Sequence, residues 1–284
     1  MLLTTKQLQE FYKIEMENIA KNKSLLTNFN IIDNYANGLK PKQLYFLAAR
    51  PGVGKTSFAL NIIFNALENL KEDECIVLFS LEMDSIEIYS KLLALANSCS
   101  LKEVETNSKK IDFEDLNKKN LFIFDRYRNN FNNEKLSEVT PDIIYKSLNS
   151  IGLKIKAVFI DYFQLLDNQK YSSEREKLSQ CSKQLKELSK IFNCNFFVLS
   201  QLSREYEKKT NNEPSFSDLK GTGSIEQDAD LIMFLYNSSN NFNVGTLIPN
   251  KKTILNLSIA KNRNGELVKT NIDFIPHLAK FIES

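Results

Sequence analysis

The chain has 284 residues, of which 42% are hydrophobic and 25% charged, and its formal net charge is +2. This length and composition predict one large globular domain with a short appendage and a sizeable core. A charge so close to zero excludes a globally basic surface, so any nucleic acid would have to bind in a local basic groove. The sequence also has no apolar run of bilayer length and no signal-peptide order at its start, so we expect a cytoplasmic protein that binds no membrane.

The cysteines and the single histidine argue against several kinds of site. Cys75, Cys99, Cys181 and Cys194 are scattered and form no C-x-x-C pair, which predicts buried, reduced thiols. His277 stands alone, which argues against a histidine-dependent nucleophile and against a histidine-rich metal site. The chemistry must therefore come from other residue types.

The first element expected is an amphipathic helix over residues Thr5 to Lys21. Its apolar residues follow a loose 3.6-residue spacing and are Leu8, Phe11, Tyr12, Ile14 and Ile19. A mostly polar connector, Asn22 to Asn28, separates this helix from the rest of the chain. We interpret the helix as an arm that packs on another surface, such as a neighbouring subunit. The alternative is a helix that folds back on its own domain.

The stretch from Leu44 to Leu60, L-Y-F-L-A-A-R-P-G-V-G-K-T-S-F-A-L, joins an apolar strand to an apolar helix through a loop with P-loop spacing. Backbone N–H groups in such a loop turn towards phosphate oxygens, and the start of the helix adds a positive field. We expect Lys55 to reach the β- and γ-phosphates of ATP and Thr56 to hold Mg²⁺. The residues expected to bind nucleotide are Ala49, Arg50, Pro51, Gly52, Val53, Gly54, Lys55, Thr56 and Ser57. The alternative is a glycine-rich turn without a ligand.

Short apolar runs then alternate with helical stretches along the chain. The runs are Leu44 to Ala49, Ile76 to Ser80, Leu121 to Phe124, Ala157 to Ile160 and Phe196 to Ser200. Continuous apolar runs indicate strands covered on both faces, hence a mostly parallel sheet flanked by helices. Two helices are expected, at Thr56 to Leu70 and at Glu174 to Phe192.

The pattern changes after the run from Leu231 to Tyr236. Ile254 to Ala260 and Lys269 to Ile275 flank the turn Asn262-Arg263-Asn264-Gly265, which predicts an antiparallel hairpin at the edge of the sheet. The fold class expected is therefore α/β, with a C-terminal antiparallel hairpin.

Polar residues follow three of the apolar runs, at the carboxyl ends where open parallel sheets bind ligands. They are Glu82, Asp161 and Gln201. Alone, each is an ordinary polar strand end, but hydrolysis of a nucleoside triphosphate needs three such groups. We assign the Mg²⁺ shell to Asp161, the attacking water to Glu82 and sensing of the γ-phosphate to Gln201.

Six stretches carry a family resemblance. They are G-L-K-P-K-Q-L-Y-F-L-A-A-R-P-G-V-G-K-T from Gly38, F-S-L-E-M from Phe79, I-D-Y-F-Q-L-L from Ile160, L-S-Q-L-S-R from Leu199, G-S-I-E-Q-D-A-D-L-I-M-F-L-Y from Gly223 and K-N-R-N-G from Lys261. Together they resemble the DnaB-type replicative helicases, within the RecA-like ATPase class. The resemblance reaches from Gly38 nearly to the C-terminus, and alanine at position 49 is usual in that family. The stretch from Gly223 disfavours a generic RecA-type recombinase.

The resemblance implies a RecA-like P-loop NTPase that forms a homohexameric ring, binds ATP between subunits and moves along single-stranded DNA to unwind a duplex in replication. It implies that Lys261 and Arg263, on the hairpin, project into the neighbour's site as a catalytic finger. Without the resemblance, these two residues would be taken for a solvated hairpin tip.

The resemblance also implies that two loops hold the DNA backbone in the central channel. The residues concerned are Lys220, Gly221, Thr222 and Gly223 in one loop, and Lys170 and Arg175 in the other. Such contacts give affinity without sequence readout. The alternative is a pair of ordinary surface loops. The family usually has Arg-Glu where this chain has Lys220-Gly221, which puts the strength of the grip in doubt.

The expected organisation is an arm over residues 1–30 and an ATPase domain over residues 31–284. The family's N-terminal helical collar, which meets primase, has no counterpart ahead of this domain in the sequence, so ring stability and primase binding are in doubt. The partners expected are single-stranded DNA, further copies of the chain, and a helicase loader or primase. The alternative function is a DnaB-like ATPase that binds and modulates a replicative helicase or its loader without unwinding DNA.

Overall fold

The computed structural model describes residues 3–21, 23–117, 120–126, 138–168, 170–171, 173–203, 206, 213–219, 223–238 and 252–283. A nine-stranded sheet runs through the described part of the chain, in the order β3-β2-β4-β5-β1-β6-β7-β8-β9. The strands are β1 (Leu44–Ala49), β2 (Glu74–Ser80), β3 (Leu121–Asp125), β4 (Lys154–Asp161), β5 (Asn195–Gln201), β6 (Leu231–Tyr236), β7 (Thr253–Asn262), β8 (Val268–Ile275) and β9 (Lys280–Glu283). The first six in this order pair in parallel, and the last three are antiparallel. The predicted α/β fold is confirmed.

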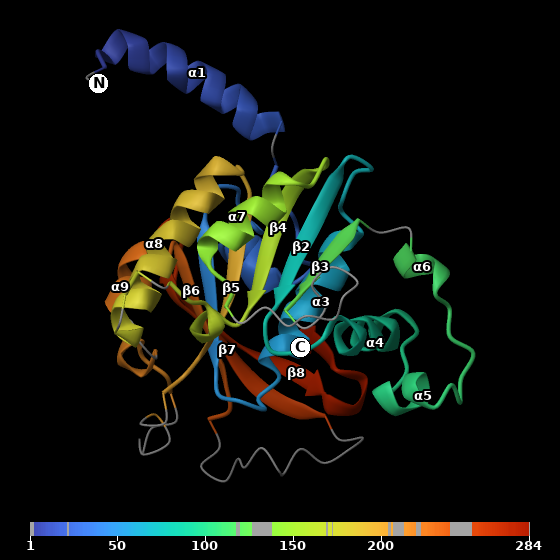
Figure 1. Ribbon diagram of the computed structural model, residues 1–284. Coiled ribbons are helices and arrows are strands. Elements are labelled where there is room, and N and C mark those ends of the chain that lie inside the picture. The colour runs from blue at the N-terminus through green and yellow to red at the C-terminus, as the bar shows by residue number, and fades with distance from the viewer. Residues whose placement is uncertain are drawn as a thin grey trace.

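Every residue of β1, β2 and β6 is buried, because alternate side chains enter different helix layers. In β1, Tyr45 and Leu47 pack in one hydrophobic cluster, whereas Leu44 and Phe46 pack in the other. Figure 1 shows helices on both faces of the sheet. This is why the central strands are continuously apolar rather than alternating.

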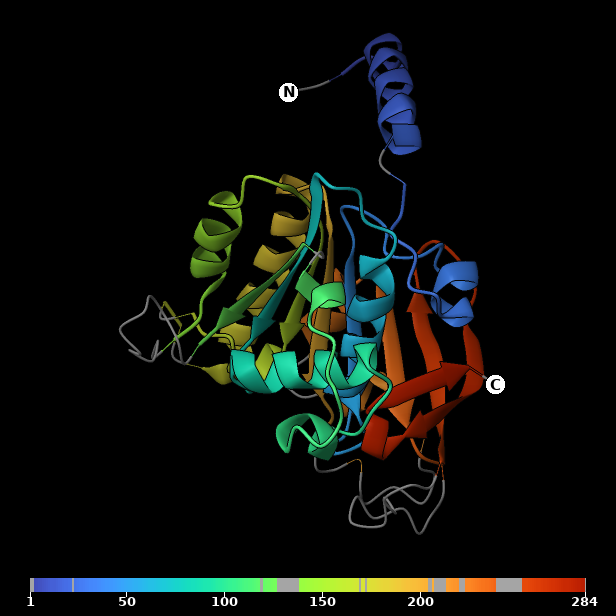
Figure 2. The same cartoon turned by 90° about the vertical axis from the view of Figure 1, so that its right-hand side faces the viewer.

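Two groups of helices form the outer layers. One contains α2 (Asn30–Tyr35), α3 (Lys55–Leu67), α4 (Ser85–Ala96), α5 (Leu101–Glu105) and α6 (Glu114–Asn117). The other contains α7 (Pro141–Asn149), α8 (Glu174–Ile191) and α9 (Gly223–Asp228). Short 3-10 turns lie at Phe163–Leu165, Phe216–Asp218 and Pro276–Leu278. Figure 2 shows the helices on opposite faces of the sheet. Each layer packs on one of the two hydrophobic clusters, so the core lies on both sides of the sheet.

The antiparallel end of the sheet differs from the prediction in one respect. β7 and β8 form the expected hairpin, but β9 pairs with β8 and is the strand at the edge. The chain reverses through the 3-10 turn after β8, and Phe281 of β9 then stacks on Phe274 with ring centroids 4.4 Å apart. A four-residue strand is too short to show a period in the sequence, so β9 was not predicted.

Helix α1 (Thr5–Lys21) has the predicted bounds and stands clear of the domain in both views (Figures 1 and 2). Four of its apolar side chains are about half exposed: Leu8, Phe11, Tyr12 and Met16. The side chains of Ile14 and Ile19 lie outside the described set. The connector returns to the domain at Lys23, whose carbonyl accepts a 3.0 Å hydrogen bond from Lys156 Nζ. The division at residue 30 stays a prediction.

All four cysteines are buried and unpaired, as predicted. Burial raises the pKa of the Cys75 thiol to about 11 and that of Cys181 to about 12. Within the described ranges, no helix has both the length and the apolar character needed to cross a bilayer.

Candidate active site

The phosphate loop leaves the end of β1, a central strand of the sheet, and enters α3. Gly52 and Gly54 have φ angles of 78° and 103°, in the left-handed region that favours glycine. A Cβ on Gly54 would lie 3.1 Å from Cζ of Phe281 and 3.3 Å from the ring of Phe274. The Gly54 carbonyl accepts the first hydrogen bond of α3 from Phe58, at 2.8 Å. Backbone angle and lack of space together explain why glycine stands at position 54.

A cavity of about 370 Å³ opens above this loop. Residues from four regions of the sequence line it: Arg50, Pro51, Gly52, Gly54, Lys55, Thr56, Ser57, Glu82, Met83, Lys91, Gln201, Phe274 and Pro276. Glu82 follows β2 and Gln201 ends β5, so the parallel topology brings both to the carboxyl edge where the loop lies. The structure therefore gathers Lys55, Glu82 and Gln201 around one cavity.

Asp161, at the end of β4, contacts the first two residues of α3. Its Oδ2 accepts a 2.5 Å hydrogen bond from Thr56 Oγ1, and its Oδ1 lies 3.7 Å from Lys55 Nζ. Lys55 Nζ and Asp161 Oδ1 are buried and have no hydrogen-bond partner among the described residues. A buried ammonium and a buried carboxylate oxygen left this way need further ligands. A triphosphate and a Mg²⁺ ion would supply them, so the residues present fit both groups.

Burial shifts the pKa values of two groups at the site in opposite directions. Burial lowers the pKa of Lys55, and the carboxylates of Asp161 and Glu82 oppose that shift. Partial burial beside the cavity raises the pKa of Glu82, and the charge of Asp161 raises it further. A carboxyl group with a raised pKa is a stronger base once ionised, which suits a residue that accepts a proton from water.

Two residues that sequence reasoning did not assign hold Gln201 in place. Gln164 accepts a 3.1 Å hydrogen bond from the Gln201 main-chain N–H, and its Nε2 donates to Ser200 Oγ at 2.9 Å. Tyr162 interacts with the Gln201 side chain, which opposes the rise that burial causes in the Tyr162 pKa, and its ring centroid lies 4.3 Å from Lys55 Nζ. Both belong to the stretch I-D-Y-F-Q-L-L, in which the sequence analysis assigns a role to Asp161 alone.

The family profile described as the DnaB-like helicase C terminal domain matches residues 24–283. The chain belongs to this family. It is 31% identical over 265 residues to the replicative DNA helicase DnaB of Geobacillus stearothermophilus, a match that covers 90% of this chain and 56% of the relative. It is 34% identical over 272 residues to a probable replicative DNA helicase of Trieres chinensis, covering 91% of this chain and 57% of the relative. This DnaB-like chain thus spans little more than half the length of these relatives.

Two solved structures share the fold. The first, an ATPase domain, matches with a TM-score of 0.76 and 28% identity, covering 97% of this chain and 98% of that chain. The second, a DnaB-like replicative helicase described with its interactions with primase, matches with a TM-score of 0.74 and 28% identity, covering 91% and 63%. The expected RecA-like fold is confirmed by the family match and these structures.

Lys261 and Arg263 lie at the amino ends of the parallel strands, whereas the phosphate loop of this DnaB-like domain lies at their carboxyl ends. The Arg263 N–H donates to the Asp230 carbonyl at 2.9 Å, and the Asp230 N–H donates to the carbonyl of Leu44, the first residue of β1. The loop follows the last residue of that strand. At a rise of about 3.3 Å per residue, β1 alone separates the two places by about 17 Å.

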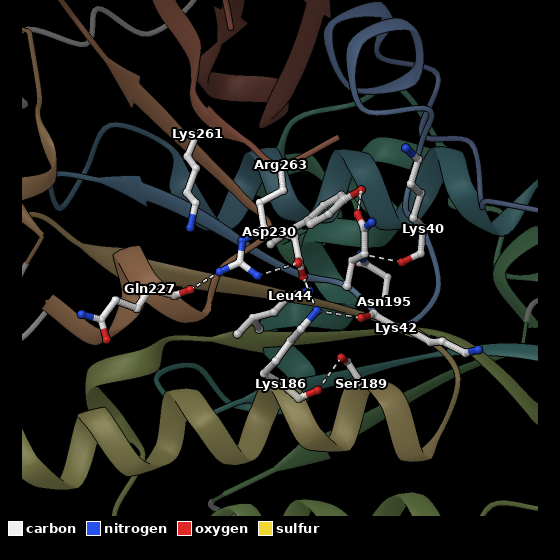
Figure 3. Close-up of polar contacts among 12 residues, drawn as sticks. Lys40, Lys42, Leu44, Lys186, Ser189, Asn195, Gln227, Asp230, Lys261 and Arg263 are labelled. Carbon is white, nitrogen blue, oxygen red and sulfur yellow. Dashed lines mark hydrogen bonds and ion pairs between the residues drawn. The ribbon is translucent and has the colours of Figure 1, made fainter. Parts of the chain in front are cut away.

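Both side chains are held by the end of α9. Lys261 Nζ donates to the Glu226 carbonyl, and Arg263 Nη2 donates to the Gln227 carbonyl, as Figure 3 shows for Arg263. Burial lowers the pKa of Lys261, and the nearby positive charge of Arg263 lowers it further. Neither residue reaches the phosphate loop of its own chain.

The residues assigned to DNA lie only partly within the described structure. Lys220, Gly221 and Thr222 lie outside the described residues, and Gly223 is the first residue of α9. Lys170 is exposed, and its main-chain N–H bonds Asn168 Oδ1 at 3.4 Å. Arg175 is also exposed but lies in the first turn of α8 rather than in a loop, because that helix begins at Glu174. The DNA-binding assignment stays a prediction.

Proposed function

We propose that this chain is the ATP-driven motor of a replicative DNA helicase, which binds single-stranded DNA and couples hydrolysis to translocation and unwinding. The observation that carries this proposal is the buried Lys55–Asp161 pair beside the phosphate loop, in which Lys55 Nζ and Asp161 Oδ1 have no hydrogen-bond partner among the described residues. Membership of the DnaB-like family supports the same function.

In this proposal, the residues of the cavity divide the work of ATP hydrolysis. Lys55 and the amides of the loop bind the β- and γ-phosphates, and Thr56 and Asp161 hold Mg²⁺, which neutralises phosphate charge when bound. Glu82 orients the attacking water and accepts its proton, and Gln201 contacts the γ-phosphate. The pKa of Glu82, raised by burial and by Asp161, favours the proton transfer.

The same proposal places Lys261 and Arg263 in the ATP site of a neighbouring subunit. Their distance from their own phosphate loop supports this assignment, as does the half-exposed side chain of Arg263. A cationic finger of this kind accelerates phosphoryl transfer by about 10³ to 10⁵. It requires an assembly of several copies, which we propose to be a hexameric ring. The exposed apolar side chains of α1 support docking of the arm on an adjacent copy.

Two variants and two matched controls test the site. Lys55→Ala should abolish ATP binding and hydrolysis, whereas Glu82→Gln should abolish hydrolysis but retain binding. Lys183→Ala and Glu187→Gln make the same changes at exposed positions of α8, outside the residues that line the cavity, and should leave turnover unchanged. Wild-type turnover in either site variant would refute the assignment.

Unwinding of a forked duplex tests the motor itself. The wild-type chain should show ATPase activity stimulated by single-stranded DNA and should separate the fork only with ATP and Mg²⁺. If single-stranded DNA stimulates hydrolysis but the protein never separates the fork, at concentrations where the assembly forms, the result would instead support a modulator of another helicase. The mass of the assembly with ATP and single-stranded DNA should equal six copies of the chain plus the bound DNA and nucleotide, and a persistent monomer would contradict the ring.

A further inference from the structure

Asp230, the residue before β6, joins three elements through one buried carboxylate (Figure 3). Its Oδ2 accepts hydrogen bonds from the main-chain N–H of Leu44 at 2.8 Å and from Nζ of Lys186, on α8, at 2.5 Å. Its Oδ1 lies 3.6 Å from Nη1 of Arg263. Oδ2 thus binds β1 and α8 of the domain, whereas Oδ1 faces Arg263.

Asp230 restrains Arg263 at two points. Its carbonyl accepts the Arg263 main-chain N–H at 2.9 Å, and its side chain attracts the guanidinium. The guanidinium also donates to the Gln227 carbonyl, and the Arg263 side chain is 46% exposed. A guanidinium carries five N–H donors, so these contacts leave donors that can face a phosphate. The surface position makes those donors accessible to another molecule.

A long side chain at a surface would otherwise move among many rotamers, and this freedom opposes any fixed contact. Asp230 is itself only 6% exposed and is held by Leu44 and Lys186, so its carboxylate cannot follow a moving partner. A fixed anion behind the guanidinium limits the directions in which Arg263 can point. A displacement of about 1 Å at a catalytic group can cost about 100-fold in rate.

We propose that Asp230 is a positioning residue that aims Arg263 at the triphosphate bound by the neighbouring subunit. This inference rests on the proposed function, in which Arg263 acts on the neighbour. Asp230 touches no substrate in this arrangement and acts through Arg263 alone. Its expected contribution lies in turnover rather than in ATP affinity.

The rival role for Asp230 is support of its own phosphate loop, through the hydrogen bonds to Leu44 at the start of β1. The two roles fall on different subunits of a mixed assembly. A chain carrying Lys55→Ala has no working ATP site but can donate Arg263, so we name it the donor. A chain carrying Arg263→Ala has a working ATP site but no finger to give, so we name it the acceptor. Mixing the two should restore turnover at the acceptor's ATP site.

The test adds Asp230→Asn to one partner at a time. Asparagine keeps the volume of the side chain and an acceptor for the Leu44 N–H, but loses the charge. In the donor, Asp230→Asn should lower the restored kcat by about 10-fold to 100-fold with KM for ATP unchanged. In the acceptor, the same change should leave the restored turnover within about twofold. Loss through the acceptor, or an equal loss through both partners, would overturn the proposal in favour of structural support.

Control substitutions separate positioning from stability. Glu74→Gln in the donor removes another buried carboxylate, which pairs with Lys154 and Lys156 at the same end of the parallel strands, and should leave the restored turnover unchanged. Asp230→Glu retains the charge but moves it by one methylene group, and should lower donor function less than asparagine does. Full donor function in both Asp230 variants would overturn the inference. If the donor and the acceptor never complement each other with Asp230 intact, the trans role of Arg263 itself fails.

Discussion

The Gly54→Ala substitution tests whether the phosphate loop needs its observed backbone. At φ 103°, an alanine occupies a region that costs about 1–3 kcal/mol for a residue with a side chain. The added Cβ would also lie 3.1 Å from Phe281 and 3.3 Å from Phe274, two rings packed against each other and unable to retreat into solvent. Overpacking of this kind costs about 1–3 kcal/mol. Together, we expect a loss of about 2–6 kcal/mol in the free energy of unfolding.

The loop can relieve this strain only by leaving the shape that turns its amides towards a phosphate. Relief of about 1.4 kcal/mol in this way lowers nucleotide affinity about tenfold. Urea titration measures the stability, and titration with a fluorescent ATP analogue measures the affinity. Gly152→Ala is the matched control, because a Cβ there meets nothing within 4 Å, and it should change stability by less than about 0.5 kcal/mol. Wild-type stability and affinity in Gly54→Ala would refute the reasoning about the loop.

Three further predictions concern charge, DNA and packing. Because the pKa of Glu82 is raised in the folded state, ionisation of this carboxyl destabilises the fold. The stabilisation by the protonated carboxyl is complete below the pKa of a free glutamate, about 4.3, and is lost as the pH rises through the raised value. Glu82→Gln should therefore exceed the wild type in stability at pH 7 but not at pH 4, as urea titrations at both values will show; the opposite order would contradict it. Lys170→Ala should reduce the salt slope of single-stranded DNA binding by about 0.7, and an unchanged slope would place Lys170 outside the DNA site. Phe58→Ala should cost about 3–5 kcal/mol in thermal or urea unfolding, since this fully buried ring packs 4.9 Å from Phe29 and 5.1 Å from Phe281; a loss below about 1 kcal/mol would contradict the packing.

The sequence predicted the central elements well because their physical signals are local. The bounds of β1 and β6 match the prediction residue for residue, since each is a six-residue apolar run buried on both faces. The two predicted helices differ from the observed ones only at their ends: α3 ends at Leu67, three residues before its predicted end, and α8 ends at Ile191, one residue before its predicted end. The convergence of Glu82, Asp161 and Gln201 followed from the general geometry of parallel sheets.

What the sequence did not predict depends on contacts between distant segments. The roles of Gln164 and Tyr162 appear only when β4 and β5 lie side by side, since both residues act on Gln201. The link between Asp230 and Arg263 likewise depends on the antiparallel pairing of β6 with β7, which no local pattern specifies.

The most direct test of the account is to identify which nucleotide each protein holds after mixing with radiolabelled ATP and Mg²⁺ in single turnover. The account predicts that the wild type yields ADP, that Glu82→Gln retains intact ATP, and that Lys55→Ala binds neither. Intact ATP recovered from all three proteins, or ADP formed by Lys55→Ala, would show that the catalytic groups lie elsewhere.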